Sequence, residues 1–235
     1  MRTLTKPMVS LAVLAALVAL PSGHSAAQSI LVGGVAGRAE SREVRDRAAD
    51  SDTRSGFVVG AWTEVTSPVP FVGALAEAVW VRRGGAFPLG GPAGLRGDVE
   101  SDWLAMTVAP VLRGGVGPVH LYVYGGPTVE LPLRTRTAAE LRSAYAAPTD
   151  QGFAVTAGAG LGVRSGRWSV QGEARRVEGL STAYSGSAGD VRHRSTELLV
   201  RVARSRRASS GQRTEPPTPA PRPAPPASWQ ARATS

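Results

Sequence analysis

The sequence predicts an all-β fold and, within that class, an eight-stranded antiparallel up-and-down transmembrane β-barrel. Apolar and polar residues alternate with a period of two over several segments, and long and short connections alternate along the chain. Helical segments are scarce because glycine interrupts nearly every apolar run; the best one, "TAAELRSAY" at 137–145, is short. The strands are expected at 29–36, 55–65, 70–82, 100–112, 117–131, 152–164, 167–179 and 192–204.

The connections predict a simple meander. Short turns such as "TSPV", "RGGV" and "SG" follow the second, fourth and sixth strands. A membrane barrel has short periplasmic turns at one rim and long external loops at the other. We therefore expect both ends of the barrel chain at the periplasmic, short-turn rim. The long loops expected at the external rim are 37–54, 84–99, 132–151 and 181–191.

The side-chain pattern favours a membrane barrel over a soluble one. Residues 167–176, "RWSVQGEARR", place Trp168, Val170, Gly172 and Ala174 on one face and Gln171, Glu173 and Arg175 on the other. Carboxylates among valine and leucine cannot face lipid at low cost, so we expect them in a narrow polar lumen. Other residues expected inside are Glu77, His120, Tyr122, Tyr124, Thr128, Glu130, Glu197 and Arg201, and those expected to face lipid include Val119, Leu121, Val123, Leu198, Val200 and Val202.

Aromatic residues cluster near the expected strand ends. Membrane barrels carry aromatic girdles at both interfaces, and this placement supports the same interpretation. The residues expected in the girdles are Phe57, Phe71, Trp80, Trp103, Phe153 and Trp168, with Trp62 close by.

The two ends of the chain differ from the body. Arg2 and Lys6 precede an apolar run at 8–20, which is shorter than the roughly 20 residues of a membrane-spanning helix, and small residues precede Gln28. Near the other end, "EPPTPAPRPAPP" has no hydrophobic periodicity. The expected organisation is a cleaved signal peptide at 1–27, an outer-membrane β-barrel at 28–204 and a disordered Pro/Arg-rich periplasmic tail at 205–235.

Composition excludes several classes of function. The formal net charge of +9 would favour nucleic acid as a partner, but Lys6 is the only lysine, arginine is abundant throughout, and export removes the chain from nucleic acid. The absence of cysteine excludes disulfides and thiolate metal sites. His120 and His193 fall on different strands, so no metal or cofactor site is expected.

Two patterns raise the question of chemistry. Gly158, Gly160 and Gly162 repeat every second residue with no helix after them, which favours close packing in the lumen over nucleotide binding. His193, Ser195 and Glu197 share one strand face and could form a hydrolytic set, but three residues in line on one strand do not by themselves bring a base to a nucleophile, and a polar stripe in the lumen or at the rim is the favoured interpretation. Neither pattern assigns a catalytic residue.

The body resembles the small outer-membrane β-barrel proteins labelled porin-family or outer-membrane β-barrel domain proteins. The resemblance covers about 29–204 and is carried by "GFVVGAW", "ALAEAVWVRRGGAF", "WLAMTVAPVLRGG", "HLYVYGGPTVEL", "GFAVTAGAGLGVR" and "WSVQGEARRVEGLSTAY". It implies an eight-stranded barrel, mostly without an assigned activity. Separately, we expect the bacterial outer membrane as the location, outer-membrane lipids and lipopolysaccharide as partners, and the barrel-assembly machinery during insertion. The last strand departs from the family by ending "LLVRVARSRR" instead of on an aromatic residue.

The expected function is therefore a structural or interaction role that displays the external loops, without catalytic activity. A small-solute channel is the first alternative. A surface lipid hydrolase that uses His193, Ser195 and Glu197 is the second.

Overall fold

The computed structural model describes residues 29–45, 52–67, 69, 71–88, 96–137, 147–148, 150–186 and 189–207. The expected signal peptide, all but the first three residues of the expected tail, and all but the first residue of the helical stretch at 137–145 lie outside the described residues. In the described part of the chain, no helix is long and apolar enough to cross a membrane.

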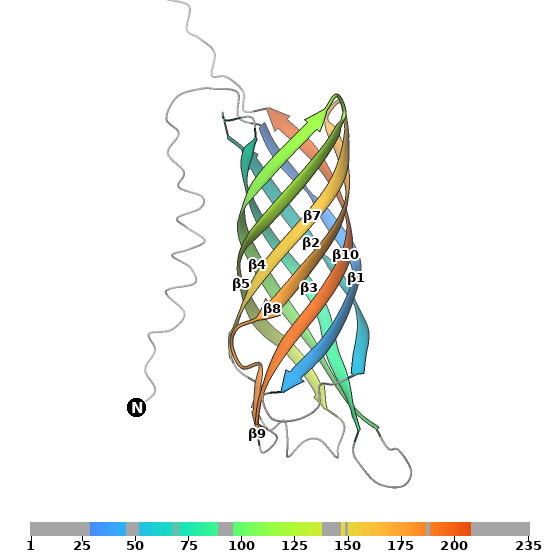
Figure 1. The fold of residues 1–235 in the computed structure, drawn as a ribbon, viewed down its shortest axis with the longest axis vertical. Coiled ribbons are helices and arrows are strands. Elements are labelled where there is room, and N and C mark those ends of the chain that lie inside the picture. Colours follow the sequence, from blue (N-terminus) through green and yellow to red (C-terminus); the bar gives the residue numbers. More distant parts are fainter. Residues whose placement is uncertain are drawn as a thin grey trace, which may run out of the picture.

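The described residues form a closed antiparallel barrel (Figure 1). Consecutive barrel strands pair with one another, and pairing of the first with the last, from Ser29↔Arg207 to Arg45↔Val191, closes the sheet. Two short strands, β6 (Ala147–Pro148) and β9 (Tyr184–Gly186), extend the sheet beside β10. The eight barrel strands are β1 (Ser29–Arg45), β2 (Asp52–Thr66), β3 (Val72–Pro88), β4 (Arg96–Val116), β5 (Val119–Thr137), β7 (Gly152–Ser165), β8 (Trp168–Gly179) and β10 (Gly189–Arg207).

All eight expected strands are present in the expected order, but several boundaries were wrong. Strands continue into each region expected to be a long loop: 37–45 and 52–54, 84–88 and 96–99, 132–137 with 147–148, and 184–186 with 189–191. The last strand also runs to Arg207, beyond the expected boundary at 204. In these strand extensions, charged residues occupy outward-facing positions that are apolar in the middle of the strands. The hydrophobic alternation therefore disappears there, while the backbone pairing continues.

The alternation of short and long connections is confirmed. Gly117 (φ 59°) and Gly166 (φ 56°) lie in two-residue turns, where the positive φ favours glycine. These turns lie at the same rim as the paired ends Ser29 and Arg207, as predicted for an even number of strands.

The two faces of the barrel wall also follow the prediction. Val170, Leu198 and Val200 point outward and are 51%, 64% and 55% exposed. The predicted interior residues are all buried: Glu77, His120, Tyr122, Tyr124, Thr128, Glu130, Gln171, Glu173, Arg175, Glu197 and Arg201. The interior is less polar than expected, because β1, β2 and β3 add buried aliphatic side chains such as Leu31, Val58 and Val79.

The aromatic girdles are only partly as predicted. Trp62 and Trp103 point into the barrel and are buried, so their expected place in the girdles was wrong. Their positions share the inward phase of Glu64 on β2 and Thr107 on β4, which strand-end proximity alone does not reveal. The outward-facing aromatics are Phe57, Phe71, Trp80, Phe153 and Trp168, and Phe57 packs edge-to-face on Trp80 with ring centroids 5.0 Å apart.

Candidate functional site: the barrel interior and its rims

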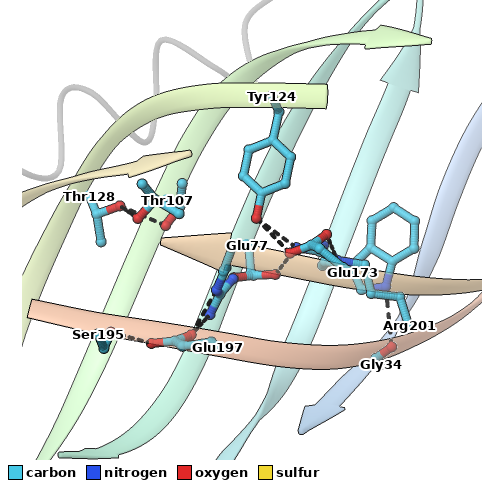
Figure 2. Close-up of polar contacts among 12 residues, drawn as sticks. Gly34, Glu77, Thr107, Tyr124, Thr128, Glu173, Ser195, Glu197 and Arg201 are labelled. Atoms are coloured by element: carbon cyan, nitrogen blue, oxygen red, sulfur yellow. Dashed lines mark hydrogen bonds and ion pairs between the residues drawn. The ribbon is translucent and has the colours of Figure 1, made fainter. Parts of the chain in front are cut away.

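A chain of charged side chains crosses the middle of the interior (Figure 2). It begins with Glu130, which contacts Arg83, and Arg83 reaches Glu197 at 3.2 Å. Arg175 then joins Glu197, at 2.6 Å, to Glu77. These residues come from β3, β5, β8 and β10, so the ion pairs tie opposite parts of the wall together.

Arg201 continues this chain to Glu173. Its Nη2 lies 2.6 Å from Glu77 Oε2, and its Nε lies 2.7 Å from Glu173 Oε2. The Arg201 guanidinium also lies over the Trp62 ring, 5.1 Å from the centroid. We call the residues Glu77, Arg83, Glu130, Glu173, Arg175, Glu197 and Arg201 the central network; they comprise four glutamates and three arginines.

Two tyrosines complete the coordination of Glu173. The hydroxyl of Tyr122 donates to Glu173 Oε2 at 2.8 Å, and that of Tyr124 donates to Oε1 at 2.6 Å. Together with Arg201, they give both oxygens of a buried carboxylate charged or polar partners. Such pairing is the condition under which buried charge is tolerated.

The glycines that raised the question of nucleotide binding form the floor for these rings. Gly158, Gly160 and Gly162 on β7 lie opposite Tyr124, Tyr122 and His120 on β5. A Cβ at any of the three would overlap with the ring it faces. The expected close packing in the lumen is thus present, and each glycine provides the space that a ring occupies.

The interior side chains fill the barrel cross-section. Arg83, Gln171, Glu197 and Arg201 each retain less than 2% exposure. Hydroxyls of Thr107, Thr128 and Thr156 form a further buried row across β4, β5 and β7, with Oγ1–Oγ1 distances of 2.8 and 2.6 Å. The middle of the barrel is therefore packed by side chains and resembles a protein core.

His193, Ser195 and Glu197 all face this interior. Their exposures are 4%, 2% and 0%, so a lipid in the surrounding phase cannot reach them. Ser195 donates its hydroxyl hydrogen to Glu197 Oε1 at 3.0 Å, and the His193 ring packs edge-to-face on Trp103. The structure therefore places the three residues in a buried polar stripe, and this geometry argues against a surface lipid hydrolase.

The rim with the long connections carries mixed charges on its outer face. Arg82 pairs with Asp102 at 2.8 Å and with Glu100 at 3.4 Å. On the other side of the barrel, Arg194 pairs with Glu178 at 2.6 Å. Because β1, β3, β4 and β10 extend beyond these charges, the wall projects past its apolar outer band at this rim.

The short-turn rim is different because arginines dominate it. One ion pair lies on the inner side of this rim, where Arg113 Nη2 is 2.6 Å from Glu64 Oε2. Outside this pair, Arg164, Arg167, Arg204 and Arg206 line a cavity between β7, β8 and β10. In the part of the chain that the structure describes, no group of three or more potential metal ligands is present.

Sequence reasoning identified the members of the central network by their inward phase, with the exception of Arg83. Arg83 directly follows "VWVR" in the sequence. Because the third strand was expected to end at residue 82, Arg83 was assigned to the following loop, whereas β3 continues through it. The signal that could have found it is its parity with Glu77, since both have odd numbers on one continuous strand.

No family model matches the sequence, and no curated protein matches it. Several solved structures are similar to the chain. Ail, the attachment invasion locus protein of Yersinia pestis, in complex with the heparin analogue sucrose octasulfate, is 15% identical with a TM-score of 0.40, covering 77% of this chain and 100% of that chain.

Two further solved structures are similar. The outer membrane protein OprG from Pseudomonas aeruginosa is 12% identical with a TM-score of 0.49, covering 79% of this chain and 99% of that chain. Neisserial surface protein A is 11% identical with a TM-score of 0.47, covering 74% of this chain and 96% of that chain. The eight-stranded barrel that the sequence resemblance implied is present in the structure of this chain itself.

Proposed function

We propose that the protein is a bacterial outer-membrane β-barrel with a closed lumen and a structural or interaction role, exported by a signal peptide that is then cleaved. The observation that carries the proposal is the inverted wall: an apolar outer band surrounds a buried network of ion pairs. A soluble barrel has the opposite arrangement, because its outer face meets water. A barrel also leaves no backbone group unpaired in hydrocarbon.

The height of the outer band suits a membrane. On β10 the outward-facing residues between Arg194 and Arg204 are Thr196, Leu198, Val200 and Val202. The uncharged outer stretch thus spans residues 195–203, close to the roughly 9–11 residues that a tilted strand needs to cross a bilayer. Arginine on both sides fits the two polar interfaces.

The expected orientation places the short turns in the periplasm and the long connections outside the cell. The projecting wall at the long-connection rim would then hold these connections away from the membrane surface, as an interaction role requires. In this setting the outer band would contact outer-membrane lipids, including lipopolysaccharide, and the barrel-assembly machinery would insert the chain. Nucleic acid is not proposed as a partner.

Fractionation of cells that express the full chain tests the location. We expect the protein in the outer-membrane fraction, with a migration on detergent gels that changes on heating. Recovery as a soluble periplasmic protein would contradict the proposal.

Planar-bilayer recording separates a closed barrel from the small-solute channel. We expect the wild type to give no stable conductance, because the central network fills the cross-section. The variant Glu173→Ala/Arg201→Ala removes two neighbouring network side chains and should conduct if it remains folded. Stable conductance of the wild-type protein would favour the channel instead.

A further inference from the structure

The short-turn rim contains an arginine-lined cavity of about 820 Å³. Its lining comes from the start of β1, the end of β7, the β7–β8 turn and the end of β10: Ser29, Arg164, Gly166, Arg167, Arg204, Ser205 and Arg206. The backbone N–H of Ser205 donates to the carbonyl of Arg167 at 2.7 Å, which fixes the turn against β10. Four arginine residues therefore line one cavity.

In the described part of the chain these four arginines form no close ion pair, although Glu64, the partner of Arg113, attracts Arg164 from a longer distance. Among the described residues, no carboxylate oxygen lies within salt-bridge distance of Arg164, Arg167, Arg204 or Arg206. The Nε of Arg164 is also buried without a hydrogen-bond partner in these residues. A buried guanidinium donor without a partner is costly, so the site is suited to an anion that accepts hydrogen bonds.

Two of the lining arginines lie on the outer face of the wall. Arg204 and Arg206 point outward from β10, whereas Arg164 and Ser205 have the inward phase. Directly opposite Arg204 on β8 lies Trp168, which is 56% exposed on the outer face. Tryptophan and arginine together are typical of the headgroup level of a membrane.

Apolar outer-face residues begin immediately beside the cavity. Val202 follows Arg204 toward the middle of β10, and Val170 and Val32 occupy the neighbouring strands at 51% and 47% exposure. A phosphate bound between the arginines would thus place attached acyl chains along an apolar surface. This continuity favours a lipid over a free anion.

We propose that this cavity binds the phosphate of an anionic phospholipid in the membrane leaflet next to the short turns. The inference rests on the proposed membrane location. Residues 208–235 of the same chain are a poor alternative occupant, because they contain three arginines and one glutamate and would repel the site.

Native mass spectrometry of the full chain tests the proposal. The protein is released from lipid nanodiscs that contain equal amounts of phosphatidylglycerol and phosphatidylcholine with identical acyl chains. We expect the wild type to retain phosphatidylglycerol preferentially. In Arg204→Gln/Arg206→Gln, that preference should fall at least about tenfold, since each removed arginine weakens attraction to anionic lipid.

The same strand provides the matched control. Arg192→Gln/Arg194→Gln removes an equal charge from outward-facing positions at the other rim of β10 and should keep the preference of the wild type. Heat-modifiable migration verifies that each variant is folded before its lipid is measured. Equal loss in both variants, or no preference in the wild type, would overturn the proposal.

A competition arm identifies the source of the phosphate. Inorganic phosphate at millimolar concentration should not displace phosphatidylglycerol if the acyl chains contribute to binding. Displacement would overturn the lipid assignment in favour of a free-phosphate site. A protein that fractionates with the outer membrane but lacks lipid preference would contradict this inference alone, whereas failure to fractionate there would contradict the proposed function.

Discussion

Gly160 lies directly beneath the ring of Tyr122 on the neighbouring strand, where any β-carbon would overlap with the ring Cζ and hydroxyl. We expect Gly160→Ala to lower the free energy of unfolding by about 1–3 kcal/mol, because the ring must move and its hydrogen bond to Glu173 must lengthen. Denaturant titration of the barrel in lipid vesicles measures the effect.

Gly172 provides the control for this prediction. It lies on β8, and a Cβ there would meet no atom within 4 Å, so Gly172→Ala should change stability by less than about 0.5 kcal/mol. Equal effects of the two alanines would mean that glycine acts through backbone flexibility and not through space for the ring.

Glu197 joins two arginines of the central network, Arg83 and Arg175, and also accepts a hydrogen bond from Ser195. Glu197→Gln should destabilise the barrel by about 1–3 kcal/mol, since Arg83 and Arg175 each lose one of their two carboxylate partners. The urea dependence of folding gives this value.

Glu40 provides the control for Glu197, because it is an exposed carboxylate that pairs with Arg38 at 3.6 Å on the outer face of the rim. Glu40→Gln should therefore stay close to wild type in the same titration. If both variants behaved alike, the interior ion pairs would contribute no more than surface ones.

Val200 tests the direction of the wall. Because its side chain faces outward in the middle of the apolar band, Val200→Arg should cost about 2–4 kcal/mol of insertion free energy and reduce the yield of heat-modifiable barrel. Thr196→Arg, near the charged boundary on β10, should cost about 1 kcal/mol or less.

Glu173→Leu tests the same assignment of the two wall faces at a residue that points into the barrel interior. It removes the acceptor of two tyrosine hydroxyls and a partner of Arg201, and should destabilise the barrel. A harmless Val200→Arg combined with a stabilising Glu173→Leu would mean that the two faces are reversed.

The variant Ser195→Ala tests whether the Ser195 hydroxyl has a structural role or acts as a nucleophile. Its hydrogen bond to Glu197 predicts a loss of about 1 kcal/mol of stability in Ser195→Ala. The lipid composition of cells that express the variant should match that of cells with the wild type. A change in lipid A acylation that requires Ser195 would restore the hydrolase hypothesis.

The sequence predicted the strand order, the inward and outward faces and most of the central network, because all three depend on a period of two. It did not predict that β1 continues to Arg45 or that Arg83 joins the network. Both lie where the outer face becomes charged, and hydrophobic alternation carries no information there. The inward positions of Trp62 and Trp103 were missed because these residues were assigned by their distance from a strand end and not by the period of two that separates inward from outward positions.

The seam between β1 and β10 has a consequence for how the protein is made. The two strands that must meet are the most distant in the chain, and every residue of β1 has a partner on β10. The barrel therefore cannot close until the nineteen-residue strand β10 has been synthesised. Until then, β1 and β8 present unpaired edges that can aggregate. If the chain is exported as proposed, it would need protection during its transit and would close in one late step.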